Sequence, residues 1–283
     1  MKHRQLPLTV VAAVLALTAL AGCGGSSDPV HTVRSAARTT LGLTAQSTLS
    51  LTGAQLFGGA PGTIVGRAQY SFPKGLGYAA LQVPAHGARP SGTAYLVFLP
   101  ARLWSKPVVS SALPEGDLWI SARFADPEST GSTPVALALE TLNPQLLLHE
   151  IATGAVAARP SGHFVVNHVP FTRYVVSVDL ARALEAPGTA GAFRAALQQQ
   201  LSALRARQGT RSPALVQIVA GVDGTGRLAQ LQASLPGSKL GTVQFGLWRF
   251  GSPIPLSLPL ESQTVDIGPV WRGVTPASMF TGE

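Results

Sequence analysis

Short segments in which apolar and polar residues alternate recur along most of this sequence. Because successive side chains of a strand point to opposite faces, this period of two predicts strands with one buried and one wet face. Residues 63–70 show it most clearly, with Ile64, Ala68 and Tyr70 on one face and Arg67 on the other. Gly/Pro-rich turns separate the segments, so we expect an antiparallel meander. The candidate strands cover residues 47–51, 63–70, 76–83, 93–99, 117–123, 163–169, 171–178, 214–222, 227–235 and 242–250.

Helices are expected where a capping side chain precedes residues at helical spacing. Asp28 and Asn143 each stand before a proline, which is typical of an N-cap followed by the first helical position. Asp179 caps a further short stretch, and residues 190–208 form the longest helical pattern. The expected helices cover residues 29–41, 144–154, 179–186 and 190–208.

Many meandering strands with a few interspersed helices predict an α+β fold, in which helices cover one face of a large antiparallel sheet. Composition agrees, since 46% of the residues are hydrophobic and only 12% are charged, which favours a folded protein with a large apolar interior. No internal repeat of 20 to 50 residues stands out, so a solenoid or propeller is disfavoured.

The N-terminus carries the only cysteine, Cys23, directly behind a basic start and an apolar run of about fifteen residues, which is the layout of a secretory signal. The stretch Leu20-Ala21-Gly22-Cys23 resembles the lipobox of bacterial lipoproteins. That resemblance implies that residues 1–22 are removed and that Cys23 is acylated, for example with palmitate. Residues 23–27 would be a short tether, and the body would lie on the extracytoplasmic face of the cell membrane. An ordinary signal peptide with an incidental cysteine is the alternative.

The charge pattern disfavours nucleic acid as a partner. The formal net charge is +8, but the basic residues are spread thinly along the chain without a cluster on one element. Arginine outnumbers lysine, and alanine and glycine are abundant, a bias typical of GC-rich genomes such as those of actinobacteria.

Motifs for catalysis or metal binding are absent from the sequence. His149 and Glu150 lack the second histidine of H-E-x-x-H, and His163 and His168 would face opposite sides of a strand. No G-x-S-x-G nucleophile turn occurs. The "DGTGR" stretch at 223–227 favours a hairpin turn over a calcium loop. We therefore expect no enzyme activity, no cofactor and no metal site.

The layout as a whole resembles a known family. The Asn-Pro helix, the segment "VNHVPFTRYVVSVD", the turn "VDGTGRL" at 222–228 and the later "VDIGPV" are similar to the mycobacterial LppX/LprG-type lipoproteins, and more distantly to the LolA/LolB carriers. The resemblance covers most of residues 28–270. Residues 191–211 look like a longer helical insertion than the family has, and the tail 271–283 has no counterpart.

The resemblance implies a half-barrel, a curved antiparallel sheet wrapped around helices, as one domain over residues 28–270. A hydrophobic cavity between sheet and helices would bind an acylated lipid or glycolipid and take part in its transport across the cell envelope, with an envelope transporter as partner. Taking a sixteen-carbon acyl chain out of a bilayer forfeits about 12 kcal/mol, so burial in a deep cavity is required to offset it.

The candidate cavity lining is the set of alternating apolar faces on the predicted strands. Because alternating apolar residues are more often plain core, a second hypothesis is a lipoprotein with a closed core that acts as an accessory or sensor subunit. An envelope hydrolase is a third and weaker one. The candidate lining residues are Ile64, Ala68, Tyr70, Tyr174, Val176, Val178, Ala229, Leu231, Ala233, Val243, Phe245 and Leu247.

Overall fold

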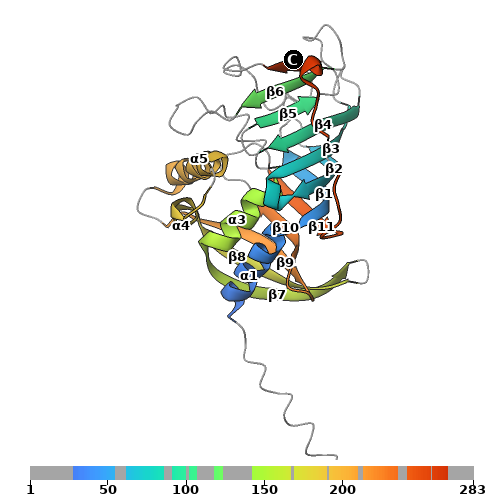
Figure 1. Ribbon diagram of the computed structural model, residues 1–283. Helices are drawn as coiled ribbons and strands as arrows, with labels where there is room; N and C mark the ends of the chain where they lie inside the picture. Colours follow the sequence, from blue (N-terminus) through green and yellow to red (C-terminus); the bar gives the residue numbers. More distant parts are fainter. Residues whose placement is uncertain are drawn as a thin grey trace, which may run out of the picture.

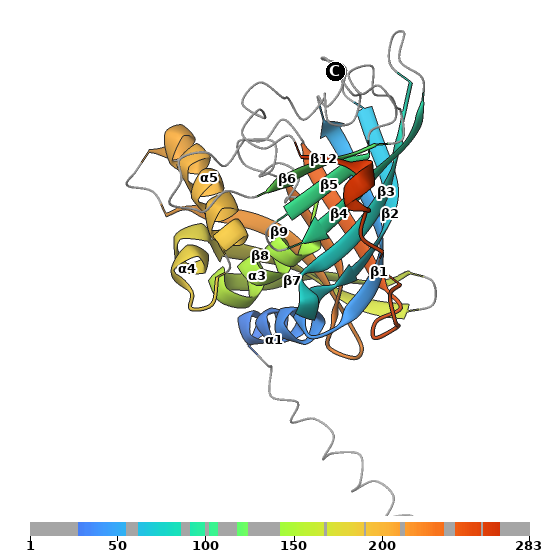
Figure 2. The same cartoon turned by 45° about the horizontal axis from the view of Figure 1, so that its top comes forward.

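Twelve strands form one sheet, and four helices lie on one side of it in the part of the chain that the computed structural model describes (Figure 1). The sheet curves around the helices, as the turned view shows (Figure 2). The predicted α+β half-barrel is therefore confirmed. The described residues are 28–54, 62–85, 91–99, 102–106, 118–123, 142–166, 169–189, 191–209, 213–234, 241–255 and 257–266.

Two antiparallel meanders make up the sheet, and they join where β1 pairs with β11. The order across the sheet is β12-β6-β5-β4-β3-β2-β1-β11-β10-β9-β8-β7, and the β12–β6 pair alone is parallel among these described neighbours. The strands are β1 (Thr44–Ala54), β2 (Gly62–Ser71), β3 (Leu76–Val83), β4 (Gly92–Leu99), β5 (Arg102–Lys106), β6 (Trp119–Arg123), β7 (Ala155–Val166), β8 (Val169–Asp179), β9 (Leu215–Asp223), β10 (Leu228–Ser234), β11 (Thr242–Trp248) and β12 (Thr264–Asp266).

The helices begin where the capping residues predict. Asp28 Oδ1 accepts a hydrogen bond from the Val30 backbone at 3.0 Å, and Asn143 Oδ1 accepts one from the Gln145 backbone at 3.1 Å. Asp179 caps in the same way. Each cap satisfies an amide that the first helical turn leaves without a partner. The helices are α1 (Pro29–Leu41), α3 (Pro144–Gly154), α4 (Leu180–Glu185) and α5 (Gly191–Gln208), with short 3₁₀ helices η1 (Phe72–Lys74) and η2 (Glu261–Gln263).

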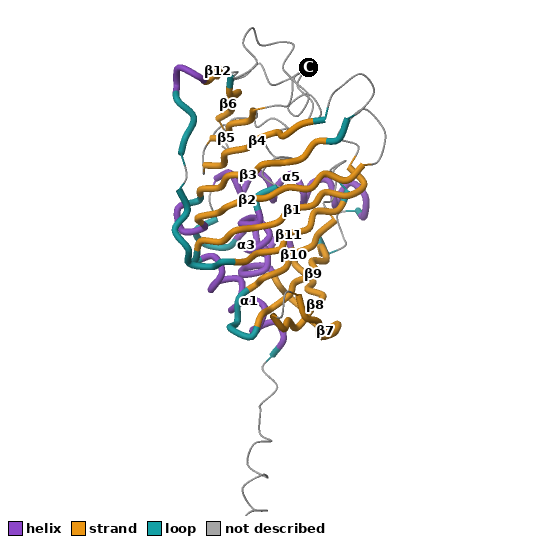
Figure 3. The backbone as a smooth tube through the Cα atoms, turned by 90° about the vertical axis from the view of Figure 1, so that its right-hand side faces the viewer, coloured by secondary structure: helices purple, strands orange, loops and turns teal. Residues whose placement is uncertain are grey.

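The two faces of the sheet differ in chemistry. We call the face that carries the helices the inner face and the opposite one the outer face. Figure 3 views the outer face, with the strands in front and the helices behind them. On β3 the alternation is complete: Gly77, Ala79, Leu81 and Val83 are buried, whereas the residues between them are half-buried or exposed. The hydrophobic core thus lies between the inner face and the helices.

The sequence pattern does not predict three parts of the sheet, which are the start of β7, all of β5 and all of β12. β7 begins at Ala155, eight residues before the predicted strand, and contains Pro160 and Gly162. The register of β7 against β8 shifts between these two residues, and Gly162 has a φ of +137°. A proline and a bulge are tolerated there because β7 is the edge of the sheet. β5 and β12 are too short, at five and three residues, to give a readable alternation.

Several sequence predictions fall outside the described residues. They are the signal at 1–22, Cys23 with its tether, His168 and the tail 271–283. Within the described part, no helix has the length and apolarity needed to cross a membrane.

The turn between β9 and β10 confirms the hairpin interpretation of "DGTGR". Asp223 Oδ1 accepts hydrogen bonds from the backbones of Thr225 at 2.9 Å and Arg227 at 3.0 Å, and Oδ2 lies 2.8 Å from Arg227 Nη2. Arg227 also stacks over the Phe250 ring, 4.5 Å from its centroid. Both carboxylate oxygens are thereby used within the turn.

Asp223→Ala is expected to lower the free energy of unfolding at pH 7 by about 2 kcal/mol. Burial alone would raise the pKa of Asp223, but the hydrogen bonds from Arg227 and Thr225 outweigh burial and leave the pKa below its ordinary value. The stabilisation is therefore present above the ordinary pKa and is lost as the pH falls through the lower folded value. Urea unfolding at pH 7 and pH 3 measures this. Equal losses at both pH values would contradict it, and Glu261→Ala, an exposed acid, is the control.

Candidate functional site

Eleven of the twelve predicted lining residues lie on the inner face, within or packed against one core cluster, whereas Ala229 lies outside that cluster. All except Tyr174 are buried, and Tyr174 packs against the same cluster at half burial. The helices contribute to this cluster too, for example through Ile151 of α3 and Leu197 of α5. The structure therefore brings eleven of the twelve predicted residues together, and a lipid-lining role for them stays a prediction. The buried members are Ile64, Ala68, Tyr70, Val176, Val178, Ala229, Leu231, Ala233, Val243, Phe245 and Leu247.

Small side chains form a row across the middle of this inner face. Ser47 of β1 pairs with Ala68 of β2, which pairs with Ala79 of β3. The row is flanked by Leu247 of β11 and Leu96 of β4. All of these side chains are buried, and the smallest of them stand where β1, β2 and β3 meet.

The apolar inner face extends beyond the strands on which most of the helices pack. Helices α1, α3 and α4 make their main sheet contacts with β7 to β10. Yet Leu81 of β3, Leu96 and Phe98 of β4 and Leu103 of β5 are fully buried as well. Among the described elements, α5 packs mainly on α4. The apolar layer is thus wider than the footprint of α1, α3 and α4.

Tyr70, one of the predicted lining residues, has a specific structural task. Its hydroxyl donates a 3.1 Å hydrogen bond to the Leu142 carbonyl just before α3, and its ring stacks on Phe72 with centroids 5.7 Å apart. Complete burial raises the pKa of the Tyr70 hydroxyl far above its ordinary value. Gln145 Nε2 donates to the Phe72 carbonyl at 3.1 Å nearby. Together these contacts fix the start of α3 to the end of β2.

A buried carboxyl stands between α3 and α5, and sequence reasoning missed it. Glu150 is 1% exposed, and burial raises its pKa to about 8. The Gln200 side chain of α5 opposes part of that rise, although Gln200 Nε2 and Glu150 Oε1 do not reach hydrogen-bond geometry with any described partner. A group with this pKa is mostly protonated at neutral pH, which lowers the cost of burying it in an apolar layer.

His149, beside Glu150 in the sequence, joins three helices. Its Nε2 atom lies 3.1 Å from Thr189 Oγ1, and its ring stacks on Phe193 of α5 with centroids 6.0 Å apart. Burial lowers the pKa of His149, and a hydrogen bond at the Ala183 backbone only partly opposes that effect. No three His, Cys, Asp or Glu side chains approach closely enough to hold a metal among the described residues.

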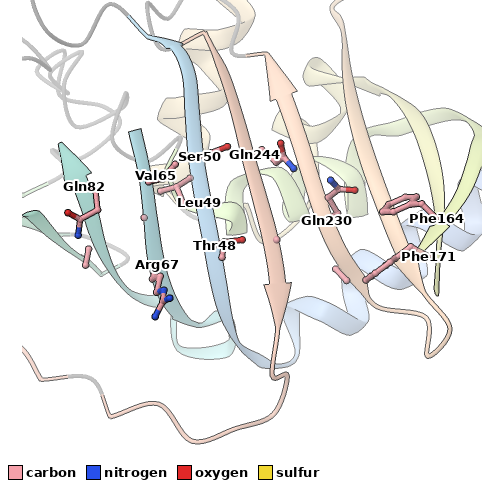
Figure 4. A pocket seen from close by; sticks show the side chains of 14 residues that line it. Thr48, Leu49, Ser50, Val65, Arg67, Gln82, Phe164, Phe171, Gln230 and Gln244 are labelled. Atoms are coloured by element: carbon pink, nitrogen blue, oxygen red, sulfur yellow. The ribbon is translucent and has the colours of Figure 1, made fainter. Parts of the chain in front are cut away.

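A groove of about 830 Å³ lies on the outer face, on the side away from the helices (Figure 4). It crosses β3, β2, β1, β11 and β10 and reaches the β7–β8 hairpin. Of the twelve predicted lining residues only Ala229 lines this described groove, and it is the one that the structure does not place in the core cluster. The register of β10 against β9 shifts between Leu228 and Gln230, which flank Ala229, so the simple alternation of faces fails there. Its other lining residues are Thr48, Leu49, Ser50, Val65, Gly66, Arg67, Ala80, Gln82, Phe164, Phe171, Gln230, Gln244 and Gly246.

One register row across the floor of the groove combines small and polar residues. In the strand register Ala80 and Thr48 are partners of Arg67, and Gly246 is the partner of both Thr48 and Gln230. A Cβ atom on Gly246 would come within 2.8 Å of Thr48 Oγ1, so the Thr48 side chain lies directly against the Gly246 backbone. Sequence reasoning missed the groove because these residues alternate as an ordinary wet face.

Two phenylalanines form one wall of the groove. Phe164 of β7 and Phe171 of β8 are paired in the hairpin and stack with centroids 5.4 Å apart. The Phe164 ring also lies over Gly221 of β9, where an added Cβ would be 3.5 Å from the ring. The bulge at Pro160 and Gly162 bends β7 ahead of this wall.

No protein-family model matches the sequence, and no curated protein matches it in a sequence comparison. Among solved structures, the chain is similar to LprF from Mycobacterium bovis, with 12% identity, a TM-score of 0.44 and coverage of 82% of this chain and 96% of that one. It is similar to the Mycobacterium tuberculosis lipoprotein LppX at 11% identity and TM-score 0.44, covering 81% and 97%. A LolA superfamily protein from Nitrosomonas europaea is similar at 8% identity and TM-score 0.26, covering 81% and 95%. The sequence resembles the LppX/LprG-type family, which is named in part after LppX. The similarity to the LppX structure concerns the fold alone.

Proposed function

We propose that this protein is an envelope lipoprotein, anchored through acylated Cys23, that binds an acylated lipid or glycolipid between its sheet and helices. In this role it takes part in moving that lipid across the envelope and works without catalysis. The lipobox supports the anchor and the extracytoplasmic location, and the predicted LppX/LprG-type layout supports the class of ligand.

The observation that carries the proposal is the width of the apolar inner face. Leu81, Leu96, Phe98 and Leu103 continue it past the strands on which α1, α3 and α4 pack. An acyl chain needs further apolar surface, because each CH₂ taken from the bilayer must be buried again at a gain of about 0.8 kcal/mol.

The row of small side chains on β1, β2 and β3 is where we place the acyl chain of the lipid. Ser47, Ala68 and Ala79 are neighbours in register, and their side chains are smaller than those of Leu247 and Leu96 at the two ends of the row. α5 is the element suited to open this region, since its main described packing is on α4 and not on the sheet.

A pair of adjacent residues on β3 tests the proposal. Ala79 faces inward beside Ala68, and Ala80 faces outward beside Arg67. The full-length lipoprotein in acceptor vesicles is mixed with donor vesicles that carry a phospholipid with one pyrene-labelled acyl chain. We expect Ala79→Trp to slow protein-dependent lipid transfer by about tenfold or more, because an indole fills the space of an acyl segment. Ala80→Trp should leave the transfer rate unchanged.

Two results would contradict the proposal. One is a wild-type transfer rate equal to the rate without protein, and the other is equal slowing by the two tryptophans. Circular dichroism confirms that each variant is folded. Where Ala79→Trp does not fold, Ala68→Leu in the same row is the smaller substitution and should slow transfer in the same direction.

A further inference from the structure

The outer groove has the chemistry of a saccharide site, and we propose that it binds an uncharged sugar or short oligosaccharide. This site is separate from the lipid site of the proposed function, since the two lie on opposite faces of the same strands. Figure 4 shows Gln230 lying between Gln244 and the two phenylalanines, which places amides beside an aromatic wall.

The polar groups in the groove suit hydroxyl groups better than charges. Gln82, Gln230 and Gln244 offer amides that both donate and accept, and Thr48 and Ser50 offer hydroxyls with the same double capacity. Sugar hydroxyls also donate and accept, so they match this set. The described lining residues include no carboxylate and one cation, Arg67, so this part of the groove is neither an acidic nor a strongly basic surface.

Several of these polar side chains have hydrogen-bonding capacity that the described part of the fold does not use. The side chains of Gln230, Gln244 and Arg67 make no hydrogen bond or ion pair within the part of the chain that the structure describes, whereas Gln82 is bonded to Thr93 at 3.1 Å. A ligand can therefore engage them without breaking a contact of the fold. Because they stand on β10, β11 and β2, they reach a ligand from several strands at once.

The aromatic wall supplies the apolar contact that a sugar ring needs. One face of a pyranose is lined by C–H groups, and the Phe164–Phe171 stack presents ring surface at the side of the amides. A volume of about 830 Å³ falls in the range of ordinary ligand pockets and leaves room for more than one sugar unit. An acyl chain would leave the amides without partners, which is costly. A peptide strand binds by pairing with a sheet edge, and this groove lies on a sheet face.

Matched variants on one strand provide the test. Gln230 and Gln232 of β10 are both half-buried on the outer face, but only Gln230 lines the groove. The full-length protein in nanodiscs is titrated by calorimetry with maltotriose and mannotriose, and separately with galactosylglycerol, which is the headgroup of a glycolipid freed of its acyl chains. We expect saturable binding, about tenfold weaker in Gln230→Ala and changed less than about twofold in Gln232→Ala.

The β3 pair separates this site from the lipid site. Ala80→Trp, at the groove floor, should abolish sugar binding and keep lipid transfer, and Ala79→Trp should do the reverse. Binding of the oligosaccharides alone identifies a free glycan as the source, and binding of galactosylglycerol alone identifies a lipid headgroup. No heat of binding with any of the three sugars, or equal weakening by the two glutamine substitutions, overturns the proposal. Either result leaves the lipid-transfer assay unaffected.

Discussion

Replacement of Phe245 by alanine is expected to lower the free energy of unfolding by about 4 kcal/mol. Phe245 lies in β11 opposite Leu49 of β1 and Leu231 of β10, where the two meanders of the sheet join. Its side chain is fully buried, so truncation removes both its transfer energy and its packing contacts. Because the β1–β11 pair joins strands that are far apart in the sequence, a cavity there weakens the contact between the two meanders.

Urea unfolding followed by circular dichroism measures this loss. The matched control is Gln244→Ala, the preceding residue, whose exposed side chain lies on the outer face. We expect the control to change the free energy of unfolding by less than about 0.5 kcal/mol. Similar losses for both variants would contradict the assignment of the two faces.

The second large effect concerns Glu150 and is a dependence of stability on pH. Its folded pKa of about 8 lies above the ordinary value of 4.5, so the folded state holds a proton that the unfolded state releases between these values. Stability therefore falls as the pH rises through that window and levels off above pH 8, with a slope of up to about 1.4 kcal/mol per pH unit. Glu150→Gln carries no ionisable proton and should lack this slope.

Unfolding of both proteins at pH 5.5, 7 and 8.5 tests this. The difference in stability between Glu150→Gln and wild type should grow with pH in favour of the variant. Glu185→Gln on α4 is the control, because Glu185 is exposed. A difference that stays constant over the three pH values would show that Glu150 is ionised in the folded protein and would contradict its burial in an apolar layer.

The helix starts could be predicted from the sequence because their causes are local. Asp28, Asn143 and Asp179 each cap a helix through an amide two residues ahead, and such contacts need no distant partner. The strand faces could be predicted for the same reason, since alternation is a property of each segment alone. The start of β7 could not, because Pro160 and Gly162 are compatible with a strand only at a sheet edge.

The outer groove depends on registers that no single segment contains. Thr48 and Gly246 become neighbours only when β1 pairs with β11, and the phenylalanine wall is added by a hairpin at the sheet edge. Glu150 was missed for a related reason, since its burial follows from how α5 lies against α3. In both cases the residue types gave no local signal that distinguishes them from an ordinary wet surface.

Lipid binding by the interior is tested most directly by the mass of the intact, membrane-extracted lipoprotein. Native mass spectrometry of the full-length protein, compared with the same sample after denaturation, separates bound lipid from the covalent anchor at Cys23. We expect one acylated lipid per chain that is lost on denaturation, present in Ala80→Trp and missing in Ala79→Trp. A native mass equal to the denatured mass, in protein taken from its own membrane, would contradict it.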